Sequence, residues 1–538
     1  MQEDGHFVPV EDRWRIAMPE WDRYDKGHPR LDDYPFDFGR LFDPYRQNVL
    51  KGDYPILGQH TFLELTATSF NLLEPRLLPT ATTPFESTRN AGQFEFFGKP
   101  NQFLNLHTLS VSVDLFHGNA AFKPVDWRVK ITPTFNSNNL ATSELAVVSP
   151  DVQQGVHRER TFSSLEEWFV EKKIADLSPD YDFVSVRLGS QPFVSDFRGF
   201  LFNDINRGVR IFGSTEANRN QFNIAYFDQL EKDTNSFLNT MRGRGQRILI
   251  ANLYRQDFVW PGLTAQASFH YNHDDPSFKF DKNHFLVRPD PVGQFRPHGL
   301  DVYYLGLGTD GHINRFNITS QLYYAFGRDS NNPIAGQGQD ISAWMAALEL
   351  SYDRDYSRFR TSYFFSSGDS NPNNATATGF DTILDGPNVA GTQFSYWQRQ
   401  NIPLLGVNLK QRLSLVPDLR SSKIQGQSNF VNPGLHLFNL GFDVDLTPKI
   451  KLVNNANLLW FDKTASLETL LFQGAIDRWI GADLSAGIEY RPLLNNNIVM
   501  AFGMATLLPG KGFKDIYDRF NEDAQILIAG FAQMTLQY

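Results

Sequence analysis

The 538-residue chain contains no cysteine. This absence excludes disulfide bonds, thiolate metal sites and the covalent attachment of c-type haem through a Cys-x-x-Cys-His motif. Long apolar runs are also missing, because no stretch reaches the roughly eighteen residues that a membrane-spanning helix needs. If the chain crosses a membrane, it must therefore do so with β-strands.

An excess of positive charge is lacking too. The chain has 50 Lys and Arg residues against 60 Asp and Glu residues, which gives a formal net charge of -10. Nucleic-acid binding relies on a basic excess that neutralises phosphates, so we expect no nucleic acid as a partner. The residues Met1 to Asp4 have neither the basic start nor the apolar stretch of a secretion signal. If the protein is exported, we expect that a signal peptide was removed ahead of this numbering.

What the chain does contain is a strict alternation of apolar and polar residues. Between Leu109 and Leu115 the sequence reads LSVSVDL, and the same period recurs along the chain. A period of two is typical of strands with one apolar and one polar face. The alternating segments exceed the five or six residues of an average soluble strand and suit the nine to eleven or so that cross a bilayer. The pattern predicts a transmembrane β-barrel.

The alternating segments can be joined by short and long links in strict turn, as outer-membrane barrels require. Short links such as 260–262, 310–312 and 353–355 contain turn-favouring residues, and the longest polar link, 368–432, is expected outside the barrel or folded into its lumen. The sequence thus predicts an all-β fold, an antiparallel barrel of about 18 strands with long extracellular loops and both ends periplasmic. The expected strands lie near 58–69, 103–116, 126–137, 164–175 (a short helix is the alternative), 182–191, 206–215, 220–230, 247–259, 262–272, 299–309, 313–327, 341–352, 356–367, 433–446, 449–461, 479–491, 497–507 and 523–538.

The predicted outward face carries aromatic residues at both strand ends, as the interfacial girdles of a membrane barrel do. A soluble all-β protein is the alternative, but no repeat typical of a propeller is present. The expected girdle residues are Trp127, Tyr352, Tyr490 and Tyr538 near the short links, and Phe135, Tyr271, Phe326, Trp344, Phe365, Phe438 and Trp460 near the long ones.

Several short motifs support a family resemblance. They are RLGSQ at 187–191, DFRG at 196–199, GVRIFG at 208–213, and SGD at 367–369 leading to GFD at 379–381. In these motifs the chain resembles the alginate-export family of outer-membrane proteins. The resemblance implies an eighteen-stranded barrel in a bacterial outer membrane. Because the family includes many porin-like proteins, the resemblance supports the fold more strongly than the substrate.

An eighteen-stranded barrel is too wide for its own side chains to fill, so its function depends on the residues that face the lumen. These charges are mixed in sign, with bases mainly on the third to sixth strands and acids mainly on the twelfth to sixteenth strands and again on the first. A field between such walls suits small polar or zwitterionic solutes, whereas a polyanion such as alginate would need a more uniformly basic lining. The alternative is that the charges pair across neighbouring strands. The expected lumen residues are Arg128, Lys130, Arg187, Arg210, Arg315, Arg358, Arg360 and Lys451, and Glu64, Asp114, Glu349, Asp443, Asp445, Asp483 and Glu489.

The predicted barrel spans 58–538, and the segment 1–57 before it does not alternate. That segment is rich in Trp, Tyr and Phe among charges and prolines, which is unusual for a disordered tail. We expect it to plug the lumen or to bind a periplasmic partner, with a plain flexible tail as the alternative.

Three arginines in one loop, Arg242, Arg244 and Arg247, could bind lipopolysaccharide phosphates, although ordinary solvation of a loop is equally compatible. His270 and His273 fall on opposite strand faces, so we expect no metal site there. No cofactor and no catalytic triad are predicted, and the protein is not expected to be an enzyme. A barrel hydrolase is the alternative with least support, since outer-membrane hydrolases assemble their triads from separate strands and spacing alone does not exclude one.

Three functions are compatible with these features. The first is a porin-like outer-membrane channel for small polar solutes. The second is a barrel sheath that holds a partner, for example a multihaem cytochrome, whose cofactors would all come from that partner. The third, implied by the resemblance, is an exporter of an alginate-like polysaccharide.

Overall fold

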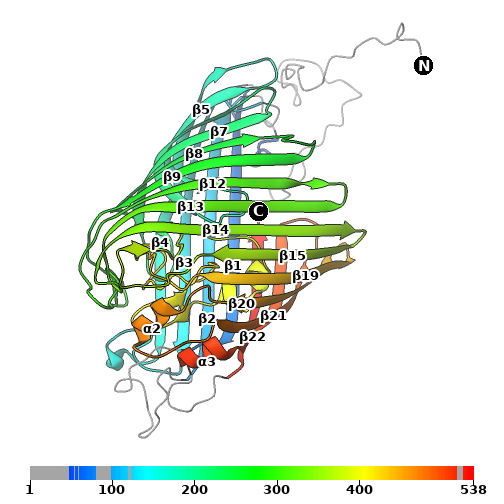
Figure 1. Cartoon of the computed structure of the whole chain (residues 1–538). Helices are drawn as coiled ribbons and strands as arrows, with labels where there is room; N and C mark the ends of the chain where they lie inside the picture. Colours follow the sequence, from blue (N-terminus) through cyan, green and yellow to red (C-terminus); the bar gives the residue numbers. More distant parts are fainter. Residues whose placement is uncertain (1–47, 54, 59, 80–98, 119–122, 518–524) are drawn as a thin grey trace, which may run out of the picture.

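The structure is a computed structural model that describes residues 48–53, 55–58, 60–79, 99–118, 123–517 and 525–538. Eighteen of the described strands form a closed antiparallel barrel, in which each strand pairs with the next and β23 pairs with β1 (Figure 1). The predicted barrel of about 18 strands is confirmed. Its strands are β1 (Thr61–Leu77), β2 (Asn101–His117), β3 (Trp127–Thr142), β4 (His157–Asp176), β5 (Phe183–Val194), β6 (Asn203–Thr215), β7 (Asn220–Lys232), β8 (Asn239–Arg255), β9 (Leu263–Asp274), β12 (Leu300–Ile313), β13 (Phe316–Asn332), β14 (Gln337–Arg354), β15 (Ser357–Ser366), β19 (Leu435–Thr447), β20 (Ile450–Trp460), β21 (Trp479–Tyr490), β22 (Ile498–Pro509) and β23 (Leu527–Gln537).

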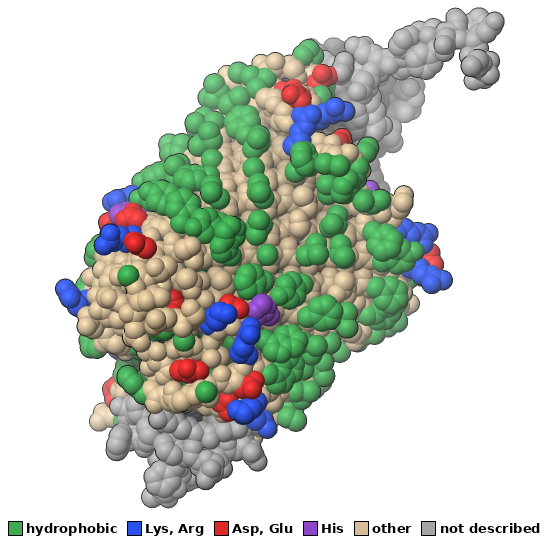
Figure 2. Space-filling view, viewed as in Figure 1, with side chains coloured by type: hydrophobic (Ala, Val, Ile, Leu, Met, Phe, Trp, Pro, Cys, Tyr) green, Lys and Arg blue, Asp and Glu red, His purple; other side chains and the backbone are tan. Residues whose placement is uncertain are grey.

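The outer surface of the barrel is apolar along the predicted parity. Figure 2 shows hydrophobic side chains across the middle of one face and charged side chains grouped toward its ends. Leu188 and Leu307 are 60% and 61% exposed, and Trp344 is 47% exposed. Such a continuous apolar surface would be costly in water and is matched by the hydrocarbon core of a bilayer. The fold therefore belongs to the class of integral membrane β-barrels.

The register between neighbouring strands aligns similar residues of the outer face into rows around the barrel. At the long-loop end, Arg247, His273 and Asp301 are cross-strand neighbours on β8, β9 and β12. Two residues further along these strands, Tyr271 and Tyr303 are paired and stack with ring centroids 4.8 Å apart. A charged row above an aromatic row above apolar rows is the order expected at a membrane interface.

Some strand ends differ from the prediction because side-chain packing in the lumen, and not the alternation of apolar and polar residues, determines where the strand ends. β1 extends to Leu77, beyond the predicted limit of residue 69. The prediction ended early because the inward-facing Leu72 is apolar and completely buried, so the alternation of apolar and polar residues is lost there. The 164–175 segment lies in strand β4, not in a helix. The predicted turn at 310–312 lies inside β12, whose ladder with β13 continues to the pair Ile313 and Phe316.

The connections alternate between a short-turn end and a long-loop end. The links at 314–315, 355–356 and 448–449 are the shortest turns of the first end, whereas 367–434 is the longest link of the second. This long loop contains β16 (Thr376–Ala377), η4 (Thr392–Phe394), α1 (Tyr396–Arg399), β17 (Ile402–Pro403) and β18 (Asn408–Lys410). Other loops carry η3 (Val152–Gln154), β10 (Lys279–Phe280), β11 (Leu286–Arg288), α2 (Ala465–Leu471) and α3 (Lys511–Tyr517). No helix in the described ranges is long and apolar enough to cross a bilayer.

The 367–434 loop folds into the lumen, one of the two placements predicted for it. Its Phe380 and Trp397 are completely buried and belong to one hydrophobic core with the inward-facing Tyr304, Tyr323 and Leu437 of the wall. Burial of large aromatic side chains is strongly stabilising. Part of the lumen is therefore a packed core, and only the remainder can hold water.

At the short-turn end, the residues before β1 contact the end of the chain. The backbone N–H of Leu65 donates to the carbonyl of Leu50 at 2.7 Å, and Asn48 Nδ2 donates to the Tyr538 hydroxyl at 3.0 Å. Lys51 Nζ lies 4.6 Å from the centre of the Tyr538 ring. Residues 48–53 thus continue the wall beside β1. Residues 1–47 and 54 lie outside the described residues, so the plug or docking role of 1–57 stays a prediction.

Candidate functional site in the barrel lumen

Two inward-turning loops shape the part of the lumen that is not packed. The 195–202 loop is held by Asp196, whose carboxylate accepts the backbone N–H groups of Arg198, Gly199, Phe200 and Leu201 at 2.6 to 3.1 Å. The hydroxyl of Tyr323 also donates to Asp196, at 3.1 Å. These contacts fix the loop so that Arg198 projects toward the β13–β14 wall.

The long loop is fixed to the wall at two buried carboxylates. Arg399 donates to Glu74 of β1 at 2.6 Å. Asp483 of β21 accepts the backbone N–H groups of Tyr396 and Trp397 at 3.0 and 3.2 Å. Because buried carboxylates are stable only when fully paired, these contacts define one position of the loop.

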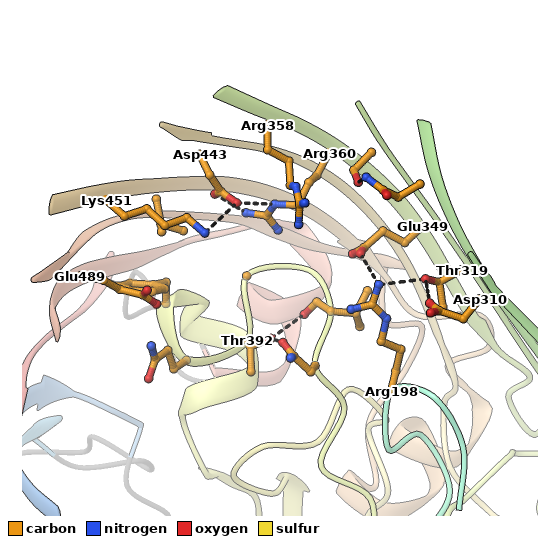
Figure 3. Close-up of a pocket in the computed structure, with 18 of the residues that line it drawn as sticks. Arg198, Asp310, Thr319, Glu349, Arg358, Arg360, Thr392, Asp443, Lys451 and Glu489 are labelled. Atoms are coloured by element: carbon orange, nitrogen blue, oxygen red, sulfur yellow. Dashed lines mark hydrogen bonds and ion pairs between the residues drawn. The ribbon is translucent and has the colours of Figure 1, made fainter. Parts of the chain in front are cut away.

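A cavity of about 810 Å³ lies between residues 388–394 of the long loop and the wall of strands β12 to β15 and β19 to β21 (Figure 3). We call it the charged cavity. Four basic and four acidic residues line it, so its formal charge is balanced. They are Arg198, Arg358, Arg360 and Lys451, and Asp310, Glu349, Asp443 and Glu489.

The charges of the charged cavity form short cross-strand chains. Arg198 donates to Glu349 at 3.0 Å and to Thr319 at 2.8 Å, and Thr319 donates to Asp310 at 2.6 Å. Arg360 donates two hydrogen bonds to Asp443, at 3.0 and 2.7 Å. Paired in this way, the side chains are held rigidly, and each still has polar atoms that can contact a solute.

A second cavity of about 590 Å³ lies against β1 to β4 and combines eight Ser and Thr hydroxyls with charged residues, namely Glu64, Asp114, Glu166, Glu167, Asp204, Lys130 and Lys232. We call it the hydroxyl cavity. Ser110 and Thr134 are hydrogen bonded at 3.0 Å, and Thr132 donates to Ser112 at 3.1 Å. Hydroxyl groups both donate and accept, so this wall can exchange hydrogen bonds with water and with neutral polar solutes.

The predicted basic wall is neutralised locally. Lys130 pairs with Glu167 at 2.6 Å, and Arg187 pairs with Glu171 at 2.6 Å while lying 4.3 Å from the Phe169 ring. Arg128 pairs with Asp114 at 3.3 Å, and Arg210 donates to Asn223 at 2.8 Å. The pairing alternative therefore applies to Arg128, Lys130 and Arg187, whereas Arg210 contacts a neutral amide.

The other predicted charged residues differ in where they lie, some at the lumen and some outside it. Arg315 is in the turn between β12 and β13 with a side chain 59% exposed, because that turn comes later in the chain than expected. Asp483 faces inward but is completely buried beneath the long loop. Arg358 pairs with Asp353 at 2.9 Å, and Asp445 is exposed near the same short-turn end. Glu64 lines the hydroxyl cavity.

The three arginines predicted to contact lipopolysaccharide lie in different environments, one buried and two at the outer surface. Arg244 is buried and donates to Asp274 at 3.0 Å and to the carbonyl of Gly426 at 2.6 Å, so it holds the long loop and is not available to lipid. Arg247 faces outward and lies 3.4 Å from Asp275, whereas Arg242 is exposed.

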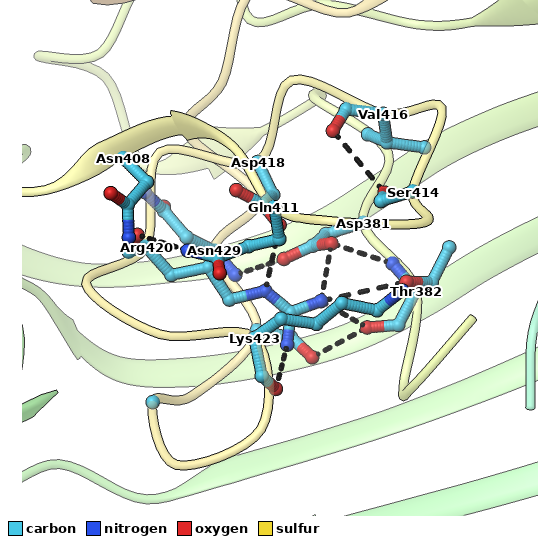
Figure 4. Close-up of polar contacts among 12 residues, drawn as sticks. Asp381, Thr382, Asn408, Gln411, Ser414, Val416, Asp418, Arg420, Lys423 and Asn429 are labelled. Carbon is cyan, nitrogen blue, oxygen red and sulfur yellow. Dashed lines mark hydrogen bonds and ion pairs between the residues drawn. The ribbon is translucent and has the colours of Figure 1, made fainter. Parts of the chain in front are cut away.

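A buried ionic cluster stabilises the interior of the long loop (Figure 4). Arg420 contacts Asp381 at 2.8 Å and Asp418 at 3.3 Å, and Lys423 contacts Asp385 at 2.7 Å. Burial raises the pKa of the Asp418 carboxyl to about 8, against the opposing effect of Arg420. Burial also lowers the pKa of Lys410 to about 7, with a further contribution from nearby Lys423. The cluster is therefore sensitive to pH near neutrality.

Three members of the site, Arg198, Asp310 and Thr319, were not predicted from the sequence. Arg198 stands in the DFRG motif, but nothing in a local pattern shows that this loop turns into the lumen. Asp310 was expected in a turn, and Thr319 is a small uncharged residue. The register of β12 and β13 places Asp310 opposite Thr319, and the loop held by Asp196 brings Arg198 to them.

No protein-family model and no curated protein sequence matches this chain. Among solved structures it is similar to Pseudomonas aeruginosa OccK7 (OpdD), with 12% identity, a TM-score of 0.47, and coverage of 88% of this chain and 98% of that one. It is also similar to Acinetobacter baumannii OccAB4, with 11% identity, a TM-score of 0.45 and coverage of 89% and 99%. A BenF-like porin from Pseudomonas fluorescens Pf-5 has 10% identity, a TM-score of 0.46 and coverage of 88% and 98%.

Proposed function

We propose that the protein is a porin-like channel that passes small polar solutes across a bacterial outer membrane. The observation that carries this proposal is the charged cavity, which offers cationic and anionic groups side by side within about 810 Å³. A lipid-facing barrel with both ends at its short-turn side fits the outer membrane, with an exported precursor whose signal peptide is removed. No residue set in the described ranges acts as a catalytic centre or cofactor site in this proposal.

The charge balance of the cavity defines the preferred solute. A solute with both a positive and a negative group can contact Arg198 or Arg360 and Glu349 or Asp443 at once. A solute of one sign meets an attractive and a repulsive partner together. Neutral polar and zwitterionic solutes therefore cross with the smallest electrostatic barrier.

The same balance argues against export of an alginate-like polyanion. Each carboxylate of the charged cavity raises the barrier for a chain of negative charges. We therefore assign the chain to the porin-like part of the family resemblance and not to its polysaccharide exporters.

The long loop argues against the alternative in which the barrel is a sheath around a partner protein. A partner held in the lumen needs space that Phe380, Trp397 and their neighbours already occupy as a packed core. A partner at the periplasmic mouth, bound by 1–57, is compatible with a channel.

The proposal is tested with the purified full chain in planar bilayers and in liposomes. We expect discrete conductance steps and faster liposome swelling in glycine or a neutral small solute than in an anion of similar size. Boiled, unfolded protein is the control. Absence of conductance from heat-modifiable barrels, or uptake of oligomeric alginate at the rate of glycine, would contradict the proposal.

A further inference from the structure

The barrel wall is incomplete beside β4, near the long-loop end. The ladder between β4 and β5 ends at the pair Trp168 and Ser190, so residues 157–167 of β4 pair only with β3. The cause is the 195–202 loop, which turns into the lumen instead of extending β5 and β6 along β4. An edge of this kind leaves backbone groups without a ladder partner.

The β7–β8 hairpin reaches across this gap through hydrogen bonds to side chains of β4. Asn239 at the start of β8 donates through its backbone N–H and, at 2.8 Å, through Nδ2 to the carboxylate of Glu166. The hydroxyl of Ser164 donates to the carbonyl of Asn239 at 2.6 Å. These few bonds take the place of a backbone ladder between β4 and the next part of the wall.

Outside these contacts lies a groove of about 820 Å³ between the edge of β4, the start of β8 and the β10–β11 hairpin. We call it the seam groove. Phe135, Met241 and Phe280 line it and are 49%, 67% and 61% exposed, and Phe162 and Leu165 complete its apolar lining. Soluble surfaces rarely leave such large apolar side chains together in water.

The apolar part of the seam groove is continuous with the lipid-facing surface. Phe135 pairs across the ladder with the outward-facing Leu109 on one side and with Ser163 on the other. Leu109 is 43% exposed. The groove therefore opens toward the outer part of the membrane, where hydrocarbon chains end and headgroups begin.

Basic residues form the polar rim of the seam groove. Lys232, Arg242, Lys279 and Lys282 line it, against the acids Asp233 and Asp281. Lys232, Lys279 and Lys282 already pair with Asp204, Glu231 and Asp233. The Arg242 side chain is exposed and has no hydrogen bond or ion pair within the described part of the chain.

We propose that the seam groove binds a phosphorylated, acylated glycolipid of the outer leaflet, that is, the lipid A part of lipopolysaccharide. Its acyl chains would lie on Phe135, Met241 and Phe280, and a phosphate would contact Arg242, with Lys282 beside it. A guanidinium and a phosphate match in charge and geometry. The lipid would cover the edge of β4 that no strand covers. This site rests on the membrane position of the barrel and not on its channel activity.

The test is native mass spectrometry of the detergent-purified full chain with added diphosphoryl lipid A. We expect one lipid bound to the wild type and about tenfold weaker binding to Arg242→Glu, because a charge-assisted contact becomes a repulsive one. Arg219→Glu, an exposed arginine in the opposite turn 216–219, is the matched control and is expected to bind like the wild type.

A second variant tests the apolar part. Phe280→Asp is expected to weaken binding of lipid A while the protein remains heat-modifiable in SDS, which shows that the barrel still closes. Equal binding of lipid A to all four proteins would overturn the proposal. Equal or tighter binding of phosphatidylethanolamine or of a single-chain fatty acid would also overturn it, and would point to a general lipid surface or a lipophilic solute. Conductance is measured separately, so failure of the channel proposal remains distinguishable.

Discussion

Arg399 of α1 donates to Glu74 of β1 at 2.6 Å, and their side chains are only 3% and 1% exposed. The pair joins the loop inside the lumen to the first strand of the wall, across 325 positions of sequence. Arg76 approaches the same carboxylate at 3.3 Å. The position of the loop, and with it the shape of the lumen, depends on this buried carboxylate.

Removing one partner of this pair should loosen the loop. Arg399→Met removes the cation closest to the buried Glu74 and leaves Arg76 and Arg412 as its charged neighbours, and breaking a buried pair typically costs about 3–5 kcal/mol. We expect faster protease cleavage within 367–434 and noisier single-channel currents, while heat-modifiability is retained. Lys511→Met, which removes a surface pair in α3, is the control. Unchanged cleavage would mean that other contacts hold the loop.

Ion preference should respond in opposite directions to the two partners Arg198 and Glu349. Arg198→Gln leaves the charged cavity with an excess of acid, so the reversal potential in a salt gradient should move toward cations. Glu349→Gln should move it toward anions. Both shifts should shrink at high salt, because the Debye length falls from about 10 Å at 0.1 M to about 3 Å at 1 M. Shifts of the same sign would show that the ions do not pass through this cavity.

The docked state of the long loop should weaken as the pH rises from 5 to 7. The folded pKa of Asp418 is raised to about 8, above the usual value near 4, so the docked loop holds a proton that a released loop loses in this range. The expected effect is at most about 1.4 kcal/mol per pH unit. Lys410 is charged in both states below pH 7 and contributes little there.

Hydrogen exchange of residues 367–434 at pH 5 and pH 7 measures this effect. Asp418→Asn should reduce the pH dependence, and Asp381, whose pKa burial raises to about 6, should account for what remains, whereas Asp355→Asn in an exposed turn should leave it unchanged. A wild-type loop that is protected equally at both pH values would refute the prediction.

Closure of the barrel should depend on Tyr538. Tyr538→Ala removes the contact with Lys51 and the hydrogen bond from Asn48 beside the β1–β23 seam, which we estimate at about 1–2 kcal/mol. The fraction of heat-modifiable barrel after refolding should fall. Tyr356→Ala, an exposed tyrosine in the 355–356 turn, is the control. An equal yield for both variants would place the stabilising contacts elsewhere.

The sequence predicted the barrel well because its signal is local. Each strand has lipid on one side, so residues such as Leu109, Val111 and Val113 must alternate with smaller or polar neighbours whatever lies further away. The prediction was weaker where the inner face is also apolar. Leu72 and Tyr323 face a packed loop instead of water, and the end of β1 was missed for that reason.

The sequence predicted a set of charged residues that face the lumen but not how most of them pair. Arg360 and Asp443 are on neighbouring strands, and their pairing was among the alternatives that the alternation left open. The positions of Arg198 and Arg399 could not be predicted, because both depend on loops that turn inward and find partners more than 150 positions away. Arg244, predicted at the surface, is buried by the same long loop.

By itself, then, the sequence determined the strand period, the closed wall and its two faces, since these follow from each residue's immediate solvent. The tertiary structure alone decided which part of the lumen is packed, which charges meet in the charged cavity and where the wall remains open beside β4. Those features depend on the paths of the two connections that turn into the lumen, 195–202 and 367–434. Contacts between residues far apart in the sequence decide these paths, and no local pattern contains such contacts.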